Sequence, residues 1–484
     1  MSSTSPAPPF FTRLRRMPDH PRDPIDVFVE LFDRFTDRRR PHEPTWWAEN
    51  GLLAGRSPKA DQVRAMLTRT GRITPEFLLG CRDTTSRLAV LLAIDNLVGE
   101  VLNLPPDSVP RRMKYIRHRY LGSGRLDDDS ELVLPRRDGY HGTRSEEGLY
   151  SLLQNIIRVP RRCSGRIRFV NAISDSDRID PYRTGVGAKG ITVGCVPFLD
   201  HPDELTFERI PRGGKYFYSI QPKPLLERRV YETLRRLDRS RCVVGVVPEL
   251  ALSKELLDAW KIAVTRPRPK QSRLRWVLAG TGAIAQSDAR KAPGNTAALI
   301  DRNSGRVVAL QDKRSPFNLQ DEDIKKYGLV PKIGRGPIQE FLTEGTHLTV
   351  IETDFGRLGI YVCEDLARED INMVDAQELG LTHLLIPVFS RPLVDFSANR
   401  WSWEVISADG YSEKLGICSV VSTSLVIHRA VSVSPAGSPI APPVVTSVSF
   451  RPVEPRKAKP HFGMSEGDPT AVSVHPVSFR RAVS

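Results

Sequence analysis

The sequence predicts an α/β protein in which a small helical domain precedes one large layered domain. Two observations predict this arrangement. Between residues 21 and 106, apolar residues recur at three- and four-residue spacings, which is the helical period. From residue 166 onwards, short apolar runs bounded by turn residues alternate with helical stretches, which is typical of stacked sheets and helices.

Composition limits the classes of protein that the chain can be. Its 484 residues are 40% hydrophobic and 26% charged, which excludes a wholly disordered or collagen-like chain. There are 71 Lys and Arg against 57 Asp and Glu, so the formal net charge is +14. A basic balance permits attraction to nucleic acid, an anionic membrane surface or an acidic substrate, but it selects none of them.

Targeting signals and cysteine spacing bear on the compartment. No apolar run approaches the length of about 18 residues that spans a bilayer, and the segment Met1–Pro9 has no apolar core of a secretion signal. The six cysteines are scattered without a close pair, which argues against a disulfide framework and a zinc ribbon. We therefore expect a cytoplasmic protein that does not associate with membranes.

The first third of the chain divides by composition. Residues 1–20 are rich in Pro and Arg and are expected to be disordered. Residues 21–106 form a helical accessory domain, and residues 107–165 a basic linker or docking segment. Within that segment Arg111–Leu121 interleaves aromatic and cationic residues, either as a nucleic-acid contact or as a solvated amphipathic helix.

Each predicted helix of the accessory domain follows from its apolar spacing. The stretches Ile25–Phe35 and Ala60–Leu67 each show one apolar face. Thr74–Leu104 predicts one or two largely buried helices that end before Pro105.

The large domain spans residues 166–432. Six apolar runs predict its buried strands: Val243–Val247, Trp276–Gly280, Thr296–Ile300, Arg357–Val362, His383–Val388 and Ile417–Val421. Helices are expected between them at residues 224–238, 252–263, 369–380 and 399–414. Residues 433–484 repeat Val, Ser and Pro without periodicity, which predicts an extended C-terminal tail.

The usual cofactor and metal motifs are missing. Gly185–Gly190 matches a dinucleotide-binding pattern, but an apparent strand follows it, whereas a phosphate-binding loop must open a helix. There is no P-loop, no Gly-x-Ser-x-Gly elbow and no His-Glu-x-x-His. His141 and His347 are interpreted as loop or core residues, so we expect no cofactor and no metal.

Three residues with complementary chemistry follow predicted strands. Glu249, Lys313 and Cys363 each come directly after an apolar run, at the edge where α/β sheets usually carry their chemistry. A carboxylate, an ammonium group and a thiol can together attack a carbon-nitrogen bond, because they supply a base, a cation and a nucleophile.

The order Glu, Lys, Cys and the surrounding motifs resemble the carbon-nitrogen hydrolase (nitrilase) superfamily over about residues 190–430. The string Cys363–Leu366 is most similar to the glutaminase domains of glutamine-dependent NAD synthetases. Further matching motifs are Leu278–Thr281, Asn295–Asp301, Glu344–Thr346, Asp354–Gly359, Gly380–Pro387 and the segment near Trp401. The resemblance implies a four-layer αββα sandwich, commonly assembled as a homodimer or larger oligomer.

The resemblance also implies roles. Cys363 would be the nucleophile that forms a thioester, Glu249 the general base and acid, and Lys313 the cation that stabilises the oxyanion together with the backbone N-H of Glu364. A second acidic residue is expected after the lysine, and Glu322, or Asp321 beside it, is the candidate. Phe317 and Phe389 are candidate substrate contacts.

These observations predict an amidase-type hydrolase of a small-molecule amide. Nitrile hydrolysis is the weaker subclass, and acyl transfer to an amine is a third possibility. The alternative from a different class is a nitrilase-fold module for binding or assembly, either nucleic-acid-associated or defence-related, in which the basic N-terminal region contacts the partner.

Overall fold

The computed structural model describes the larger part of the chain. The described residues are 21–36, 44–103, 108, 111, 133–135, 149, 152–153, 155–158, 166–172, 191–284, 292–320, 337–353, 355–367, 369–389, 393–395, 400–415, 417–426, 444–454, 457–465 and 468–477. They belong to two compact units, one comprising Met1–Ser164 with two short later segments, and the other most of the chain after it.

The first unit is helical. Its helices are α2 (Pro24–Phe35), α3 (Pro44–Gly55), α4 (Pro58–Thr70), α5 (Pro75–Gly80) and α6 (Thr84–Asn103). Helices α2, α4 and α5 begin with a side-chain cap followed by proline, a combination that satisfies a free N-H and presets φ. Helix α6 packs against α2, α3 and α4. The predicted stretch Thr74–Leu104 is therefore two helices.

A short strand pair completes this unit. Strands β1 (Val133–Pro135) and β2 (Ile156–Arg158) are antiparallel. The Asp95 carboxylate on α6 is 1% exposed and accepts the backbone N-H groups of Asn155 and Ile156, which ties β2 to the helix. No helix in the described part of either unit is long and apolar enough to cross a bilayer.

The second unit contains two large sheets. One has the described strands, in spatial order, β10 (Val307–Asp312), β9 (Thr296–Asp301), β8 (Trp276–Gly282), β7 (Val244–Val246), β4 (Ile191–Cys195) and β21 (Ser473–Val477). The other has β20 (Lys457–Ser465), β19 (Val444–Glu454), β18 (Cys418–Ser422), β15 (His383–Pro387), β14 (Gly356–Ile360), β13 (Leu348–Thr353) and β3 (Ile167–Asn171). The central strands β4, β7 and β8 are parallel to one another, as are β14, β15 and β18.

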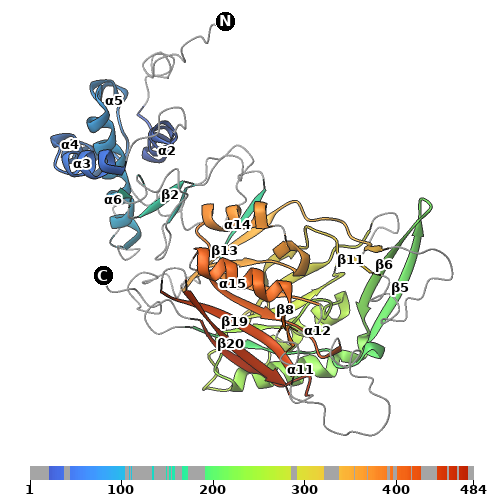
Figure 1. Cartoon of the computed structure of the whole chain (residues 1–484). Helices are drawn as coiled ribbons and strands as arrows, with labels where there is room; N and C mark the ends of the chain where they lie inside the picture. The colour runs from blue at the N-terminus through green and yellow to red at the C-terminus, as the bar shows by residue number, and fades with distance from the viewer. Residues whose placement is uncertain are drawn as a thin grey trace, which may run out of the picture. The chain divides into compact units, whose positions relative to one another are not determined.

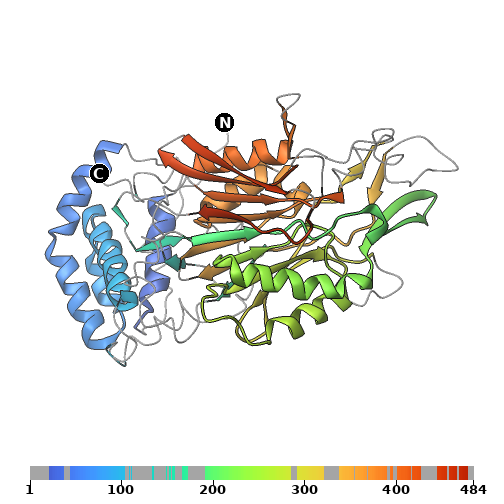
Figure 2. The ribbon, with the colours of Figure 1, turned by 90° about the horizontal axis from the view of Figure 1, so that it is seen from below.

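The sheets stack face to face, with helices outside them (Figures 1 and 2). Helices α11 (Glu227–Arg239) and α12 (Lys254–Val264) cover the sheet of β7 and β8, while α14 (Glu369–Glu378) and α15 (Trp403–Leu415) lie beside the sheet of β15 and β18. Contacts between the two sheets include Ser447 Oγ to His475 Nε2 at 2.7 Å. The predicted four-layer αββα sandwich is confirmed.

A smaller sheet stands at one end of the sandwich. It has the described order β11 (Asn318–Leu319), β12 (Ile338–Glu340), β6 (Lys215–Pro222) and β5 (Leu205–Arg212). Strands β5 and β6 form a long hairpin, and β12 pairs with β6 in parallel, so that Glu340 is the register partner of Tyr218. The sequence analysis did not predict this sheet.

The prediction of an extended tail over residues 433–484 is wrong for the part that the structure describes, which is residues 444–454, 457–465 and 468–477. Strands β19 and β20 extend one large sheet, and β21 pairs with β4 at the edge of the other. Side chains from this segment are buried, including Val448, Phe450 and His475 at 0% exposure. The segment lacks clean alternation because several polar residues, such as Ser447 and Ser449, point between the sheets, where they hydrogen-bond His475.

The six strands and four helices that the sequence predicts for the large domain agree closely with the described elements. Each of the six predicted buried strands overlaps an observed one, from β7 to β18. The four predicted helices correspond to α11, α12, α14 and α15, with ends that shift by a few residues. Strong apolar runs flanked by turn residues were sufficient to predict these strands, because both faces of each central strand are buried.

The C-terminal strands should contribute to stability. Phe450 on β19 is 0% exposed and packs against Trp401 with ring centroids 5.9 Å apart. We expect Phe450→Ala to lower the free energy of unfolding by about 3 to 5 kcal/mol, measured by urea denaturation. Met464→Ala on β20, where the side chain is 45% exposed, should change it by less than about 1 kcal/mol. Equal effects of the two substitutions would contradict the packing of this segment.

Candidate active site

The three residues singled out from the sequence lie where strands of both large sheets end. Glu249 follows β7, Lys313 follows β10 and Cys363 follows β14. All three side chains are buried, each at 2% exposure. The fold therefore brings a carboxylate, an ammonium group and a thiol from three distant parts of the chain into one buried region.

Lys313 is held between two carboxylates. Its Nζ donates to Glu249 Oε1 at 2.8 Å and to Glu340 Oε2 at 2.7 Å. Burial alone would lower the pKa of Lys313, but the charges of Glu249 and Glu340 raise this pKa well above its usual value. Lys313 is thus a fixed cation at neutral pH.

Backbone geometry sets the position of Glu249. The next residue, Leu250, has φ +60° and donates its N-H to Thr281 Oγ1 at 3.3 Å. The loop runs close against β8, where a Cβ on Gly280, whose φ is +88°, would lie 2.7 Å from the Pro248 carbonyl oxygen. Glycine at this bulge in β8 is required by both its φ and this close approach.

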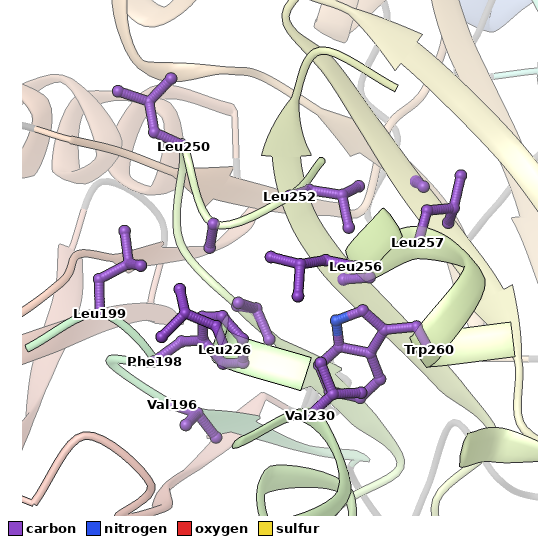
Figure 3. Close-up of a cluster of buried hydrophobic side chains, with 14 of the residues drawn as sticks. Val196, Phe198, Leu199, Leu226, Val230, Leu250, Leu252, Leu256, Leu257 and Trp260 are labelled. Carbon is purple, nitrogen blue, oxygen red and sulfur yellow. The ribbon is translucent and has the colours of Figure 1, made fainter. Parts of the chain in front are cut away.

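Hydrophobic packing anchors the same loop. Leu250 and Leu252 belong to a buried cluster with Leu256 and Trp260 of α12 and Val230 of α11. Figure 3 shows Leu252, Leu256 and Trp260 lying together, a short distance along the chain from Glu249. The core beneath the outer helices thereby fixes the loop that carries the carboxylate.

Cys363 occupies a strained turn at the start of the 3-10 helix η6 (Cys363–Ala367). Its φ is +46°, which is unusual for a residue with a side chain. Burial raises the pKa of the Cys363 thiol well above its usual value, and the negative charge of Glu249 adds to this effect. The Cys363 side chain is therefore a neutral thiol at neutral pH.

One backbone N-H connects the thiol and the carboxylate. The Phe389 N-H donates to Glu249 Oε2 at 2.8 Å and also interacts with the Cys363 sulfur. Phe389 was predicted as a substrate contact. Its backbone contributes to the site in this way, while its side chain is 9% exposed and packs against the hydrophobic cluster.

Asp365 links the two loops that carry Lys313 and Cys363. Its Oδ1 accepts the N-H groups of Arg314 and Ser315, both at 2.9 Å, and its Oδ2 accepts that of Val362 at 3.2 Å. The side chain is 0% exposed, and burial raises the pKa of Asp365 from 3.8 to about 6. Sequence reasoning used Asp365 only as part of a motif.

The second acidic residue at the lysine is Glu340, which sequence reasoning missed. The predicted residue Glu322 and its alternative Asp321 lie outside the described residues. Glu340 sits on β12, and its backbone N-H and Oε2 contact the carbonyl and the N-H of Phe317 at 2.9 and 3.1 Å. No local signal marks Glu340, because Ile338–Glu340 is a strand of only three residues whose position is set by its pairing with β6.

Tyr218 and Phe317 also approach the site. The Tyr218 hydroxyl donates to the Phe317 carbonyl at 3.4 Å, and the ring is 5% exposed. Burial and the charge of Glu340 raise the pKa of Tyr218, so that it stays protonated. The predicted substrate contact Phe317 is half-buried beside these groups.

Several further predictions fall outside what the structure describes. The Gly185–Gly190 pattern, His141 and almost all of Arg111–Leu121 lie outside the described residues. His347 is half-buried and its carbonyl accepts from Gln311. Glu364 follows Cys363 in η6. Among the described residues, no three His, Cys, Asp or Glu side chains are grouped as metal ligands.

Comparison with known proteins gives structural similarities only. No protein-family model matches the sequence, and no curated protein matches it either. Among solved structures, the chain is similar to the NitFhit protein of C. elegans, with 14% identity and a TM-score of 0.39, over 60% of this chain and 61% of that one.

Two further solved structures are covered more completely. Nit3 of Saccharomyces cerevisiae, described as a member of branch 10 of the nitrilase superfamily, shares 14% identity with a TM-score of 0.36 over 60% of this chain and 90% of its own. An amidase from Nesterenkonia sp. shares 14% identity with a TM-score of 0.37 over 60% of this chain and 94% of its own.

At TM-scores below 0.5 the similarity does not define an activity, which has to be argued from the side chains. What the fold and the site define together is a four-layer α/β protein with a buried cysteine, lysine and two carboxylates in one network.

Asp365 leads to a prediction about pH. Because the pKa of Asp365 is higher in the folded protein than the usual 3.8, the folded state binds the proton more tightly. This contribution to stability is fully present below pH 4 and is lost as the pH rises through about 6. At about 1.4 kcal/mol for each unit of pKa, the loss is about 3 kcal/mol.

The measurement is the unfolding free energy of wild type and Asp365→Asn at several pH values. Relative to Asp365→Asn, wild type should lose about 3 kcal/mol of unfolding free energy between pH 3 and 7. The exposed Asp203→Asn serves as a control and should follow wild type throughout. A constant difference between wild type and Asp365→Asn would contradict the prediction.

Proposed function

We propose that the chain is a carbon-nitrogen hydrolase of the amidase type that works through a thioester on Cys363. The observation that carries the proposal is the buried Lys313 ammonium, bonded to both Glu249 and Glu340 beside a neutral thiol. This arrangement supplies a nucleophile, a base and a cation for an unreactive amide carbon.

Glu249 is the proposed general base. Because the pKa of the Cys363 thiol is raised, the sulfur carries its proton in the free protein and must lose it as it attacks. The Glu249 carboxylate accepts this proton while the carbon-sulfur bond forms. It then passes the proton to the departing nitrogen as the carbon-nitrogen bond breaks, which leaves a thioester and a free amine or ammonia.

Lys313 is the proposed electrostatic stabiliser. Two of its three N-H groups donate to Glu249 and Glu340, which leaves one for the oxygen of the tetrahedral intermediate. The backbone N-H of Glu364 is the proposed second donor, because it directly follows the nucleophile. The raised pKa of Lys313 excludes it as a base at neutral pH.

Hydrolysis of the thioester completes the cycle. Glu249 removes a proton from water as the oxygen attacks the thioester carbon, and the proton returns to the sulfur when the carbon-sulfur bond breaks. The products are a carboxylic acid and the regenerated thiol. An amine in place of water would give acyl transfer. A nitrile would be attacked by the same nucleophile. The substrate class that we propose is an amide.

The first test is selective labelling of Cys363. We expect iodoacetamide at pH 7 to alkylate Cys363 faster than the other cysteines, because among the thiols that the structure describes only Cys363 adjoins both a carboxylate base and a buried cation. Burial also raises the pKa of Cys195 and Cys418 to about 12 and that of Cys242 to about 11, and without such a base and cation beside them these thiols should react slowly. Intact-mass measurement followed by peptide mapping reads out the site.

Cys363→Ala is the matched control for this labelling. It should remove the fast phase and leave the slow modification of the remaining thiols unchanged. A wild-type rate at Cys363 no faster than that at the other cysteines would count against the hydrolase, and the basic N-terminal region would then become the first place to look for a binding function.

The second test addresses Glu340. We expect Glu340→Gln to lower the pKa of Lys313, because one of the two neighbouring negative charges that raise it is removed. The kcat/KM of this variant should then fall at alkaline pH, where Lys313 loses its proton. The measurement is ammonia release from a panel of primary amides as a function of pH. Glu344→Gln, at an exposed position four residues later, is the control. Identical alkaline behaviour of the two variants would contradict the role of Glu340.

A further inference from the structure

The network around Lys313 closes into a ring through Asn295. The Asn295 Nδ2 donates to Glu249 Oε1 at 3.0 Å and to Glu340 Oε1 at 3.1 Å. Lys313 Nζ bridges the same two carboxylates from its own side at 2.8 and 2.7 Å. Each carboxylate thus accepts from Lys313 and Asn295 in addition to one backbone N-H, which comes from Phe389 for Glu249 and from Phe317 for Glu340.

The orientation of the amide is fixed from behind. The Thr281 hydroxyl donates to Asn295 Oδ1 at 2.5 Å, and its oxygen accepts the N-H of Leu250. Since the only hydroxyl proton goes to the amide oxygen, the NH2 group must face the two carboxylates. Thr281 is 0% exposed and Asn295 is 5% exposed, so water has little access to this arrangement.

The backbone adds a third constraint. The Asn295 carbonyl accepts the N-H of Lys313 at 2.8 Å, where β9 begins and β10 ends. The residue that presents the amide is therefore tied to the residue that presents the ammonium group. Movement of one would displace the other.

The charge balance explains why a neutral donor is needed. One ammonium group between two carboxylates leaves a net negative charge in a buried place, which favours protonation of a carboxylate. A second cation would remove the deficit but would also weaken the base that Cys363 needs. An amide offers two N-H groups without charge, so it stabilises both ionised carboxylates and leaves the single cation in place.

We infer that Asn295, oriented by Thr281, is a positioning residue that holds the carboxylates of Glu249 and Glu340 around Lys313 and stabilises their negative charge through hydrogen bonds. The inference rests on the proposed function, because it assigns Asn295 to the readiness of Glu249 as the base.

The test is the pH dependence of Cys363 alkylation by iodoacetamide, from pH 5 to 9, in the full chain. Asn295→Leu removes both N-H donors at nearly constant volume and adds no charge. We expect the acidic limb of its rate profile to move to higher pH, because the negative charge of the carboxylate loses a hydrogen bond that stabilises it. Thr281→Val, which leaves the ring itself intact but frees the amide to turn, should shift the limb in the same direction by less.

Controls separate this inference from a purely structural role. Asn303→Leu makes the same substitution at an exposed turn between β9 and β10, and its profile should superimpose on that of wild type. Thermal denaturation reports folding, and Thr281→Val serves as the test if Asn295→Leu does not fold.

The outcomes are distinct. If wild-type Cys363 is not alkylated preferentially, the proposed function fails and the inference fails with it. If wild-type Cys363 is alkylated preferentially but the variants keep the wild-type acidic limb, Asn295 is not a positioning residue and the hydrolase stands. An equal loss of rate at every pH, with the limb in place, likewise overturns the inference.

Discussion

The site depends on a single buried ammonium group that is shared by two carboxylates. Lys313 is 2% exposed, and burying it without partners would cost several kcal/mol. Its contacts with Glu249 and Glu340 offset that cost and fix the ends of β7, β10 and β12 relative to one another. A cation held in this way needs no rearrangement when negative charge develops on a substrate.

The two stacked sheets are what make this contact possible. Glu249 and Lys313 come from one large sheet, Cys363 from the other and Glu340 from the small sheet at the end. Asp365 connects the lysine loop to the cysteine turn, and the N-H of Phe389 connects the cysteine to Glu249. Backbone hydrogen bonds and the packed cluster beneath Leu250 and Leu252 hold these groups in position. Loops without such support would not hold them.

The C-terminal segment shows how a fold can use a weakly patterned sequence. Residues 444–477 supply strands to both large sheets, yet their serines and histidines obscure the alternation that usually identifies strands. Several of those polar groups find partners across the sheets, as Ser447 and Ser449 do with His475. Their pairing is a property of the tertiary structure, which is why local periodicity predicted a tail.

The sequence by itself determined the central strands and helices, because apolar runs such as Val243–Val247 and His383–Val388 must be buried on both faces. It also determined that Glu249, Lys313 and Cys363 follow strands, which brought the candidate residues to notice. Tertiary structure alone decided which second carboxylate meets Lys313, since Glu340 lies on a short strand whose pairing with β6 has no local signature. Tertiary structure likewise decided the role of Asn295. Its hydrogen bonds to Glu249 and Glu340, which are 46 and 45 positions away in the chain, exist only after the sheets have packed.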